Sequence, residues 1–213
     1  IILVAGAFMN FVAGLVIILV IFFLAGSPAA PVFTGVMAGA EEVLDTGLQP
    51  GDRFYTIDGH RIYFQSDAMI YLQRAGEDVD VTVVRDGEKV DLGVISLPYR
   101  LLTDENGQQV EKRGIYVGEF LEDTVFTRLQ NSWYQAIDYV RMVWMGLGDI
   151  FTGAVGLKDM SGVIGITAMA GEVGQAGAEA AGLFGAVINL LDFTALIAIN
   201  LAVMNLLPIP ALD

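Results

Sequence analysis

The stretch GLQPGDRFYTIDGHRIYF, residues 47–64, decides how the middle of this chain folds. A Pro-Gly-Asp turn is followed by a short strand-like segment, Arg53–Ile57, and then by Asp58 and Gly59. Asp-Gly is among the strongest short-range signals for a two-residue hairpin turn, because both central residues of that turn need a positive φ. The pattern therefore predicts two short strands joined by a tight turn.

The residues after this hairpin predict a helix and a second hairpin. In SDAMIYLQRAG, Ser66 is a candidate N-cap and Gly76 a candidate C-cap of a helix of about ten residues. Residues 79–97, VDVTVVRDGEKVDLGVISL, form two alternating segments around Asp86 and Gly87. The order strand, strand, helix, strand, strand predicts a small β-barrel with one helix beside a groove.

Apolar segments enclose this polar middle. The chain has 213 residues, of which 54% are hydrophobic and 17% charged, and almost all charges fall between Glu41 and Glu179. Residues 1–25, IILVAGAFMNFVAGLVIILVIFFLA, carry no charge. As a helix they would extend roughly 37 Å, enough to cross a hydrocarbon core. A cleaved signal peptide would need a basic start and a shorter apolar region, so we predict a transmembrane helix.

A second apolar segment, LFGAVINLLDFTALIAINLAVMNLL, occupies residues 183–207. Its single acid is Asp192. If Asp192 lies within the span, it should face protein or water. If the span starts at about Phe193, Asp192 lies near the membrane interface, and we prefer this second interpretation. Amides in lipid need partners, so the asparagines of both apolar segments should face other helices. These are Asn10, Asn189, Asn200 and Asn205. The sequence thus predicts an α+β membrane protein in which transmembrane helices flank a β-rich module.

Composition excludes several classes of function. The net charge of −14 repels phosphate backbones, which excludes a nucleic-acid partner. The chain has no cysteine, so disulfides and thiolate metal sites are absent. The single histidine, His60, follows the Asp-Gly turn and cannot build a histidine-rich metal site by itself.

Residues 99–182 link the β-rich module to the second apolar segment. GIYVGEF, residues 114–120, predicts a strand, and residues 133–157 have a helical pattern. The acids and Arg141 in that helix make it too polar for a comfortable span, so an interfacial or bundle-packing amphipathic helix is expected, with a third span as the alternative. A Gly- and Ala-rich segment follows, over residues 160–182.

The last nine residues, NLLPIPALD, combine a helix break with a carboxylate. Pro208 and Pro210 lack N–H donors and end the helix near Leu207. Irregular backbone at membrane depth is tolerated only where protein or a watery cavity lines it. Asp213 would supply a hard anionic oxygen of the kind that binds Zn²⁺. From these residues alone, a membrane-edge acid at a helix end is preferred over a metal ligand.

Three turn motifs within residues 31–98 resemble those of a PDZ domain of the bacterial protease-associated type. They are GLQPGD at residues 47–52, IDG at 57–59 and RDG at 85–87. PDZ domains bind an extended peptide as an added strand, often with its terminal carboxylate on backbone N–H groups. The resemblance implies a PDZ-like β-barrel module whose peptide groove is formed by Val36, Met37, Ala38, Gly39, Ala68, Met69 and Leu72. A spacer or size filter that binds nothing tightly is an equal alternative.

The terminal stretch is similar to a motif of the site-two protease family of intramembrane zinc metalloproteases, Asn-x-x-Pro-x-Pro-x-x-Asp. The motif falls on Asn205, Pro208, Pro210 and Asp213. GAFMN, residues 6–10, resembles the family's Gly-Pro-x-x-Asn, with Ala7 where proline is usual. SGVIGI, residues 161–166, resembles Ser-Gly-Pro-Val-Gly-Ile. Together with the PDZ-like module, these elements follow the family's order over nearly the whole chain.

The resemblance implies a zinc ligand at Asp213 and substrate-binding roles for Asn205 and Asn10. The family's His-Glu-x-x-His, which supplies two ligands and the general base, is not in this sequence, so no catalytic residue is expected here. We therefore expect an internal fragment that is inactive alone.

The implied organisation is a transmembrane helix (1–25), the PDZ-like domain (31–98), a linker region (99–182) and a second transmembrane helix with the metal-ligand motif (183–213). The implied enzyme is a multi-pass protein of the cell (inner) membrane, with its PDZ-like module outside the cytoplasm. It would cleave transmembrane segments of membrane-tethered regulatory proteins, for example an anti-sigma factor. The alternative is a membrane-anchored, non-catalytic PDZ adaptor.

Overall fold

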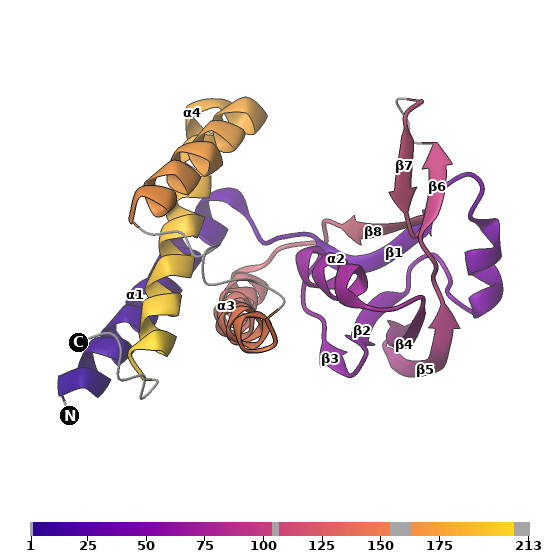
Figure 1. Cartoon of the computed structure of the whole chain (residues 1–213), viewed down its shortest axis with the longest axis horizontal. Coiled ribbons are helices and arrows are strands. Elements are labelled where there is room, and N and C mark those ends of the chain that lie inside the picture. Colours follow the sequence, from indigo (N-terminus) through magenta and orange to yellow (C-terminus); the bar gives the residue numbers. More distant parts are fainter. Residues whose placement is uncertain (1, 104–106, 154–162, 207–213) are drawn as a thin grey trace. The chain divides into compact units, whose positions relative to one another are not determined.

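The computed structural model describes residues 2–103, 107–153 and 163–206. The chain forms two compact units. The helical unit comprises Ile1–Ser27 with Asp123–Asp213, and the β module comprises Pro28–Glu122. The chain is therefore a mixed α/β protein in which one unit consists of helices and the other is built around a sheet (Figure 1).

The β module contains one antiparallel sheet, a separate hairpin and two short helices. Along the sheet the strands pair in the order β5-β4-β2-β1-β8, and β3 pairs with β2. Strands β6 and β7 form the separate hairpin. The path of described strands is open, with β5 and β8 at its ends, so the predicted closed barrel stays a prediction. The elements are β1 (Ala30–Val36), the 3-10 helix η1 (Glu41–Thr46), β2 (Arg53–Ile57), β3 (His60–Arg61), α2 (Gln65–Arg74), β4 (Asp78–Arg85), β5 (Glu88–Ser96), β6 (Arg100–Thr103), β7 (Gln109–Lys112) and β8 (Ile115–Glu119).

Both predicted Asp-Gly turns are present. Asp58 and Gly59 have φ of 48° and 74°, and they join β2 to β3. Asp86 and Gly87 have φ of 52° and 84°, and they join β4 to β5. Positive φ at both central residues matches the right-handed twist of the flanking strands, which is why this dipeptide predicts the hairpins correctly.

An ion pair joins two of the motifs that the sequence singled out. Asp52 ends the Pro-Gly-Asp turn, and its carboxylate accepts hydrogen bonds from Arg85 Nε and Nη2, both at 2.7 Å. Asp52 also accepts from the backbone N of Gln49 at 2.8 Å, and Arg85 Nη2 donates to the Gly47 carbonyl at 2.8 Å. Asp52 is only 1% exposed, so the turn before β2 is bound to the end of β4 by a buried carboxylate.

Helix α2 begins one residue before the predicted cap. Ser66 lies inside the first turn, and Asp67 takes the capping role instead. Its carboxylate accepts from the backbone N atoms of Tyr63 at 2.8 Å and Phe64 at 3.1 Å. A carboxylate in the first helical turn satisfies free N–H groups and favours the positive end of the helix dipole.

Strand β8 extends the sheet beyond residue 98. It pairs antiparallel with β1, with Val117 opposite Phe33 and Ile115 opposite Val36. Gly114, which precedes it, has φ of 75°, and a Cβ there would lie 2.3 Å from the Ala40 Cβ. Only glycine fits at this position, because both the φ and the close approach exclude a side chain.

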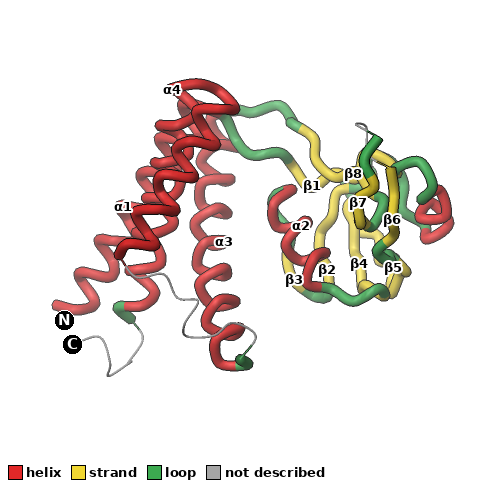
Figure 2. Tube along the Cα trace, turned by 45° about the horizontal axis from the view of Figure 1, so that its top comes forward, coloured by secondary structure: helices red, strands yellow, loops and turns green. Residues whose placement is uncertain are grey.

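The helical unit contains α1 (Ile2–Ala25), α3 (Val125–Phe151) and α4 (Val163–Met204). The three helices lie side by side (Figure 2), and each contributes residues to the buried core. A Cβ at Gly14 of α1 would lie 2.7 Å from Ile199 Cγ1, so glycine allows α1 and α4 to approach closely. The core residues are Ile18, Ile21 and Phe22 of α1, Ala136 and Tyr139 of α3, and Ala195 and Ile199 of α4.

Helix α4 consists of two limbs. Ala181 and Gly182 have non-helical backbone angles, and the chain reverses there (Figure 1). The limbs touch through glycines, since a Cβ at Gly177 would lie 2.3 Å from the Gly185 carbonyl oxygen. Asn189 Nδ2 of the second limb donates to the Val173 carbonyl of the first limb at 3.3 Å. The small residues of the predicted Gly- and Ala-rich segment thus form half of a helical hairpin.

Two of the described helices are long and apolar enough to cross a membrane. They contain Val4–Ala25, with a mean hydropathy of 2.8, and Met169–Met204, with a mean hydropathy of 2.0. The second stretch includes the reversal at Ala181 and Gly182, so it consists of two shorter limbs and not of one continuous helix. Helix α3 begins at Val125, eight residues before the helical pattern that starts at residue 133. Thr124 caps this start, because its Oγ1 accepts a hydrogen bond from the backbone N of Thr127 at 3.2 Å.

Candidate functional site

The β module has a groove between α2 and β8, with a volume of about 430 Å³. Its α2 wall consists of Gln65, Met69, Leu72 and Gln73, which share one helix face because they are three or four residues apart. Its other residues are Met37, Tyr99, Lys112, Arg113, Ile115, Tyr116 and Val117. The lining thus combines apolar side chains with the amides of Gln65 and Gln73 and the cations of Lys112 and Arg113.

Strand β8 presents a free backbone edge to this groove. The backbone N of Met37 donates to the Gly114 carbonyl at 2.8 Å, so Gly114 faces β1. Because amide groups alternate in direction along an antiparallel strand, the amides of Ile115 and Val117 face away from β1. Strand β8 also ends the sheet among the described strands. An unpaired edge beside an apolar groove is the arrangement that accepts a peptide as an added strand.

One side chain already occupies part of that edge. Gln65 Nε2, from the first turn of α2, donates to the Val117 carbonyl at 2.6 Å. This bond lies on the edge that faces away from β1, which agrees with the alternation of the strand. The backbone N of Gln65 donates to the Ala29 carbonyl at 2.9 Å, so the start of α2 is fixed against the residue before β1.

Arg113 closes the opposite end of the groove. It is 5% exposed, and its guanidinium donates to the carbonyls of Gly76 at 2.9 Å, Ala75 at 2.6 Å and Leu97. Its charge also lies 4.5 Å from the centre of the Tyr99 ring. The Arg113 Nε is buried without a hydrogen-bond partner among the described residues. The guanidinium thus satisfies the carbonyls of the two residues that follow α2 and links them to the residues before β8.

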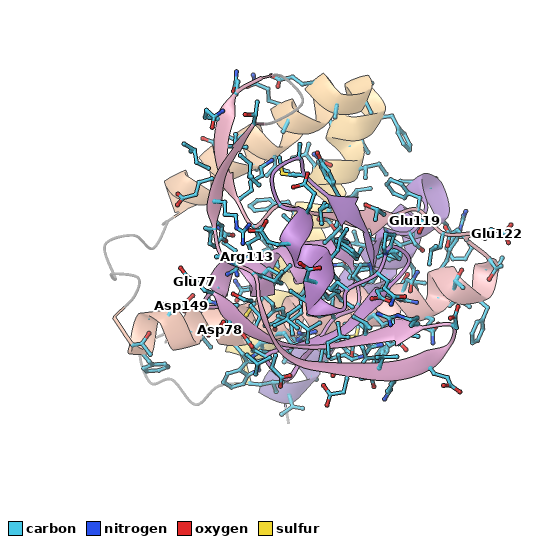
Figure 3. All side chains as sticks on the ribbon, turned by 90° about the vertical axis from the view of Figure 1, so that its right-hand side faces the viewer. Glu77, Asp78, Arg113, Glu119, Glu122 and Asp149 are labelled. Carbon is cyan, nitrogen blue, oxygen red and sulfur yellow. The ribbon has the colours of Figure 1, made fainter. Side chains whose placement is uncertain are left out.

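Figure 3 shows Arg113 and Glu119 at opposite ends of β8. The exposed acids Glu77 and Asp78 lie on the same side of the β module as Arg113 (Figure 3). Two carboxylates therefore lie on the same side of the β module as the cationic end of the groove.

The structure brings three of the seven predicted groove residues to this cavity: Met37, Met69 and Leu72. Ala68 is fully buried beneath α2. Val36 lies within β1, opposite Ile115, and Ala38 and Gly39 lie in an exposed turn. None of these four lines the cavity. The role of these four residues in binding stays a prediction.

Sequence reasoning predicted the strand at residues 114–120 but missed its place beside α2 in the groove. Nothing local assigns that strand to the edge beside α2. Gln65 and Arg113 were missed for the same reason, since each acts through a partner far along the chain. The one local signal is the sequence Arg113-Gly114, a cation and a glycine before an alternating strand.

The helical unit has an apolar cavity of about 440 Å³ near the start of α1 and the end of α4. The predicted substrate-binding residues lie on these helices: Asn10 is half-buried on α1, and Asn205 is exposed just after α4. Neither side chain lines the cavity, although Leu206 does. The lining residues are Val4, Ala7, Phe8, Phe11, Val140, Trp144, Ala202, Val203 and Leu206.

The predicted metal ligand, Asp213, lies outside the described residues, as do Pro208 and Pro210. Within residues 2–103, 107–153 and 163–206 there is no group of three His, Asp or Glu side chains that could hold a metal ion. The described part of the chain therefore does not form a zinc site by itself.

Two acids of the helical unit, Asp192 and Asp138, have partners on its helices. Tyr139 of α3 donates its hydroxyl hydrogen bond to the Asp192 carboxylate of α4. Asp138 forms an ion pair with Arg141 one helical turn later, at 2.8 Å. Asp192 of the second limb of α4 thus has a protein partner, and its predicted position near the membrane interface stays a prediction.

A clasp around Asp123 joins the end of α1 to the start of α3. Its carboxylate accepts from the backbone N of Ser27 at 3.0 Å, from Ser27 Oγ at 2.9 Å and from Arg128 Nε at 2.9 Å. Arg128 Nη1 also donates to the Phe23 carbonyl at 3.2 Å. Burial alone would raise the pKa of Asp123, but the Ser27 hydrogen bonds, the Arg128 charge and the Thr127 hydroxyl hold it below its ordinary value.

Comparison with known proteins places this chain in a family of proteases. The model of peptidase family M50 matches residues 1–213, and the chain belongs to that family. The regulator of sigma-W protease RasP of Bacillus subtilis (strain 168) is 29% identical over 210 residues, which cover 98% of this chain and 46% of the relative.

Two further relatives carry similar names. The zinc metalloprotease RasP of Geobacillus kaustophilus is 26% identical over 98% of this chain and 46% of its own length. A putative zinc metalloprotease of Clostridium perfringens is 30% identical over 98% of this chain and 58% of its own length. The chain therefore spans about half the length of the curated relatives that it matches.

Proposed function

We propose that this chain belongs to an intramembrane zinc metalloendopeptidase that cleaves transmembrane segments of membrane-tethered regulatory proteins. The observation that carries the proposal is the match to peptidase family M50 over residues 1–213. The name of the Bacillus subtilis relative, regulator of sigma-W protease, supports a substrate that controls a sigma factor, such as an anti-sigma factor. Two apolar helices of spanning length support a position in the lipid bilayer of the cell membrane.

In this proposal Asp213 is one zinc ligand, and Asn205 and Asn10 contact the substrate backbone. A carboxylate oxygen suits zinc, and bound zinc would polarise a scissile carbonyl and activate a water. An amide side chain suits an unwound transmembrane segment, since it offers both a donor and an acceptor to exposed peptide groups. Asn205 follows the end of α4, eight positions before Asp213 in the sequence.

The β module is proposed to be a PDZ-like peptide-binding domain outside the cytoplasm. The free edge of β8 and the apolar wall of α2 support this assignment, because an extended peptide can pair with the edge while its side chains enter the groove. The proposal assigns binding to the α2/β8 groove, with Met37, Met69 and Leu72 as its apolar contacts.

The zinc assignment is tested on the full-length protein in detergent. Zinc content is measured in the wild type, in Asp213→Ala and in the control Asp78→Ala, whose carboxylate is exposed on β4 of the β module. We expect one zinc to be lost in Asp213→Ala and retained in the control. Unchanged zinc in Asp213→Ala would remove the role given to this residue.

A second candidate, a non-catalytic membrane-anchored adaptor, is favoured by the groove alone. The two candidates differ in one measurement, which is cleavage of a reconstituted single-span substrate by the full-length protein. Cleavage that zinc chelation abolishes supports the protease. Peptide binding in the β module without any cleavage supports the adaptor.

A further inference from the structure

Gln65 occupies a hydrogen-bonding site on the edge of β8 that a bound peptide would use. An antiparallel or parallel strand added to this edge would donate a backbone N–H to the Val117 carbonyl. Gln65 Nε2 donates to that oxygen at 2.6 Å, and its amide lies against the backbone of Gly118. The side chain therefore makes the contact that an incoming strand would make.

The same side chain fills the space in which the peptide backbone would run. A Cβ at Gly118 would lie 2.5 to 2.7 Å from the Gln65 amide atoms, so the amide is in close contact with the strand. Gln65 also lines the groove itself, at the end opposite Arg113. Strand addition over Val117 requires the Gln65 side chain to leave.

The physical cost of that departure is small. The backbone of Gln65 is fixed by its bond to Ala29, but the side chain has three rotatable torsions and is only half-buried. A neutral hydrogen bond of this kind changes an equilibrium by a factor of roughly two to ten, because water replaces the lost partner. Such a contact is strong enough to bias the groove toward a closed form and weak enough for a ligand to displace.

We propose that Gln65 is an intramolecular competitor that closes the Val117 end of the groove and lowers its affinity for extended peptides. This inference rests on the peptide-binding role proposed above for the β module. The ligand is an extended segment of another polypeptide, with apolar side chains facing Met69 and Leu72. The fraction of molecules in which Gln65 has left Val117 sets the apparent affinity, as in any equilibrium between closed and open forms.

The proposal predicts that removing the donor strengthens binding. Gln65→Met keeps the length and volume of the side chain but cannot donate to the Val117 carbonyl. Gln73→Met is the matched control, because Gln73 lines the same groove and no hydrogen bond joins it to β8 in the described part of the chain. Gly118→Ala is a second variant, since its methyl group would push the Gln65 amide from the edge.

The probe is an array of random-sequence dodecapeptides. Detergent-solubilised full-length protein is applied to it as wild type, Gln65→Met, Gln73→Met and Gly118→Ala. The strongest binders are then remade with a fluorescent label, and their dissociation constants are measured by anisotropy. Thermal unfolding of each variant is recorded in parallel, because the positive φ of 128° at Gly118 disfavours alanine.

We expect Gln65→Met to bind the selected peptides roughly two- to tenfold more tightly than wild type, with Gln73→Met unchanged. Equal or weaker binding by Gln65→Met would overturn the competitor role and leave the peptide groove intact. Binding by none of the proteins would overturn the proposed groove, and this inference with it. If Gly118→Ala does not fold, the comparison of Gln65→Met with Gln73→Met still decides whether Gln65 competes with the peptide.

Discussion

The β module and the helical unit are held together by different means. In the β module, charged side chains bind specific backbone groups: Asp52, Asp67 and Arg113 are each at most 5% exposed, and each accepts or donates several hydrogen bonds. In the helical unit, close contacts occur at glycines: the Ile199 side chain packs against Gly14, and the backbones of Gly177 and Gly185 approach each other directly. Buried polar groups at defined positions fix the turns of the β module, and the small volume of these three glycines lets the helices of the helical unit pack closely.

This difference determines which substitutions each unit tolerates. A buried carboxylate that several N–H groups share cannot be replaced without leaving those donors unpaired. A glycine in a helix crossing cannot accept even a methyl group if the atom opposite is backbone. Four predictions use this contrast, from the largest expected effect to the smallest.

Asp52→Ala should destabilise the β module by about 3 kcal/mol, because it removes a charged acceptor from Arg85 and from the Gln49 N–H. The measurement is the free energy of unfolding by denaturant, with fluorescence as the signal. Asp45→Ala, at an exposed position in η1, is the control and should change it by less than about 0.5 kcal/mol. Equal values for the two variants would show that the ion pair does not hold the module together.

Gly177→Ala should destabilise the helical unit by about 1–3 kcal/mol, because the new Cβ would lie 2.3 Å from the Gly185 carbonyl oxygen. Gly171→Ala is the matched control on the same limb of α4, where nothing lies within 4 Å. The control should be neutral or slightly stabilising, since alanine favours helix over glycine. The midpoint of thermal unfolding in detergent distinguishes them, and a shift of the same sign in both would contradict the glycine contact.

Asp67→Ala should cost about 1–2 kcal/mol, because the N–H groups of Tyr63 and Phe64 lose their acceptor. Ser66→Ala should change stability by less than about 0.5 kcal/mol, since Ser66 is exposed within the first turn. The pair compares the cap that the sequence suggested with the cap that the structure uses. A larger loss for Ser66→Ala, measured by denaturant unfolding, would reverse the assignment.

The Asp123 clasp should make the helical unit weakly sensitive to acid. The pKa of Asp123 is lower in the folded protein than in the unfolded chain, so its contribution to stability is present above the unfolded pKa, about 3.9, and is lost as the pH falls through the folded pKa. The effect should stay below about 1 kcal/mol, because the clasp is near the surface.

The measurement is the thermal midpoint from pH 6 to pH 3 for the wild type and Asp123→Asn. The wild type should lose more stability on acidification than the variant, whose amide does not titrate. The control is Asp45→Asn, at an exposed position, which should follow the wild type. Parallel curves for the wild type and Asp123→Asn would exclude a role for this carboxylate.

Local patterns predicted much of the fold correctly. Asp58-Gly59 and Asp86-Gly87 form hairpin turns because positive φ is a local requirement. The uncharged helix α1 and the apolar limb of α4 follow from composition alone. The helix break at Gly182 falls where the Gly- and Ala-rich segment ends, although the close pairing of the two limbs was not foreseen.

The composition of the groove could be predicted from the sequence only in part. Met37, Met69 and Leu72 were singled out and lie in the cavity, but the strand beside them, β8, was not assigned to it. Its partner β1 precedes it by about 80 residues, as in the pair Phe33 and Val117. A pairing of that range depends on register and loop closure, which no local pattern specifies.

The sequence by itself determined the turns, the two apolar helices and the family motifs, because each depends on neighbouring residues or on composition. Only the tertiary structure decided that β8 ends the sheet among the described strands, that Arg113 satisfies the carbonyls just after α2, and that Gln65 donates to the Val117 carbonyl. The physical reason is that a hydrogen bond between distant segments exists only once the whole sheet has set their separation.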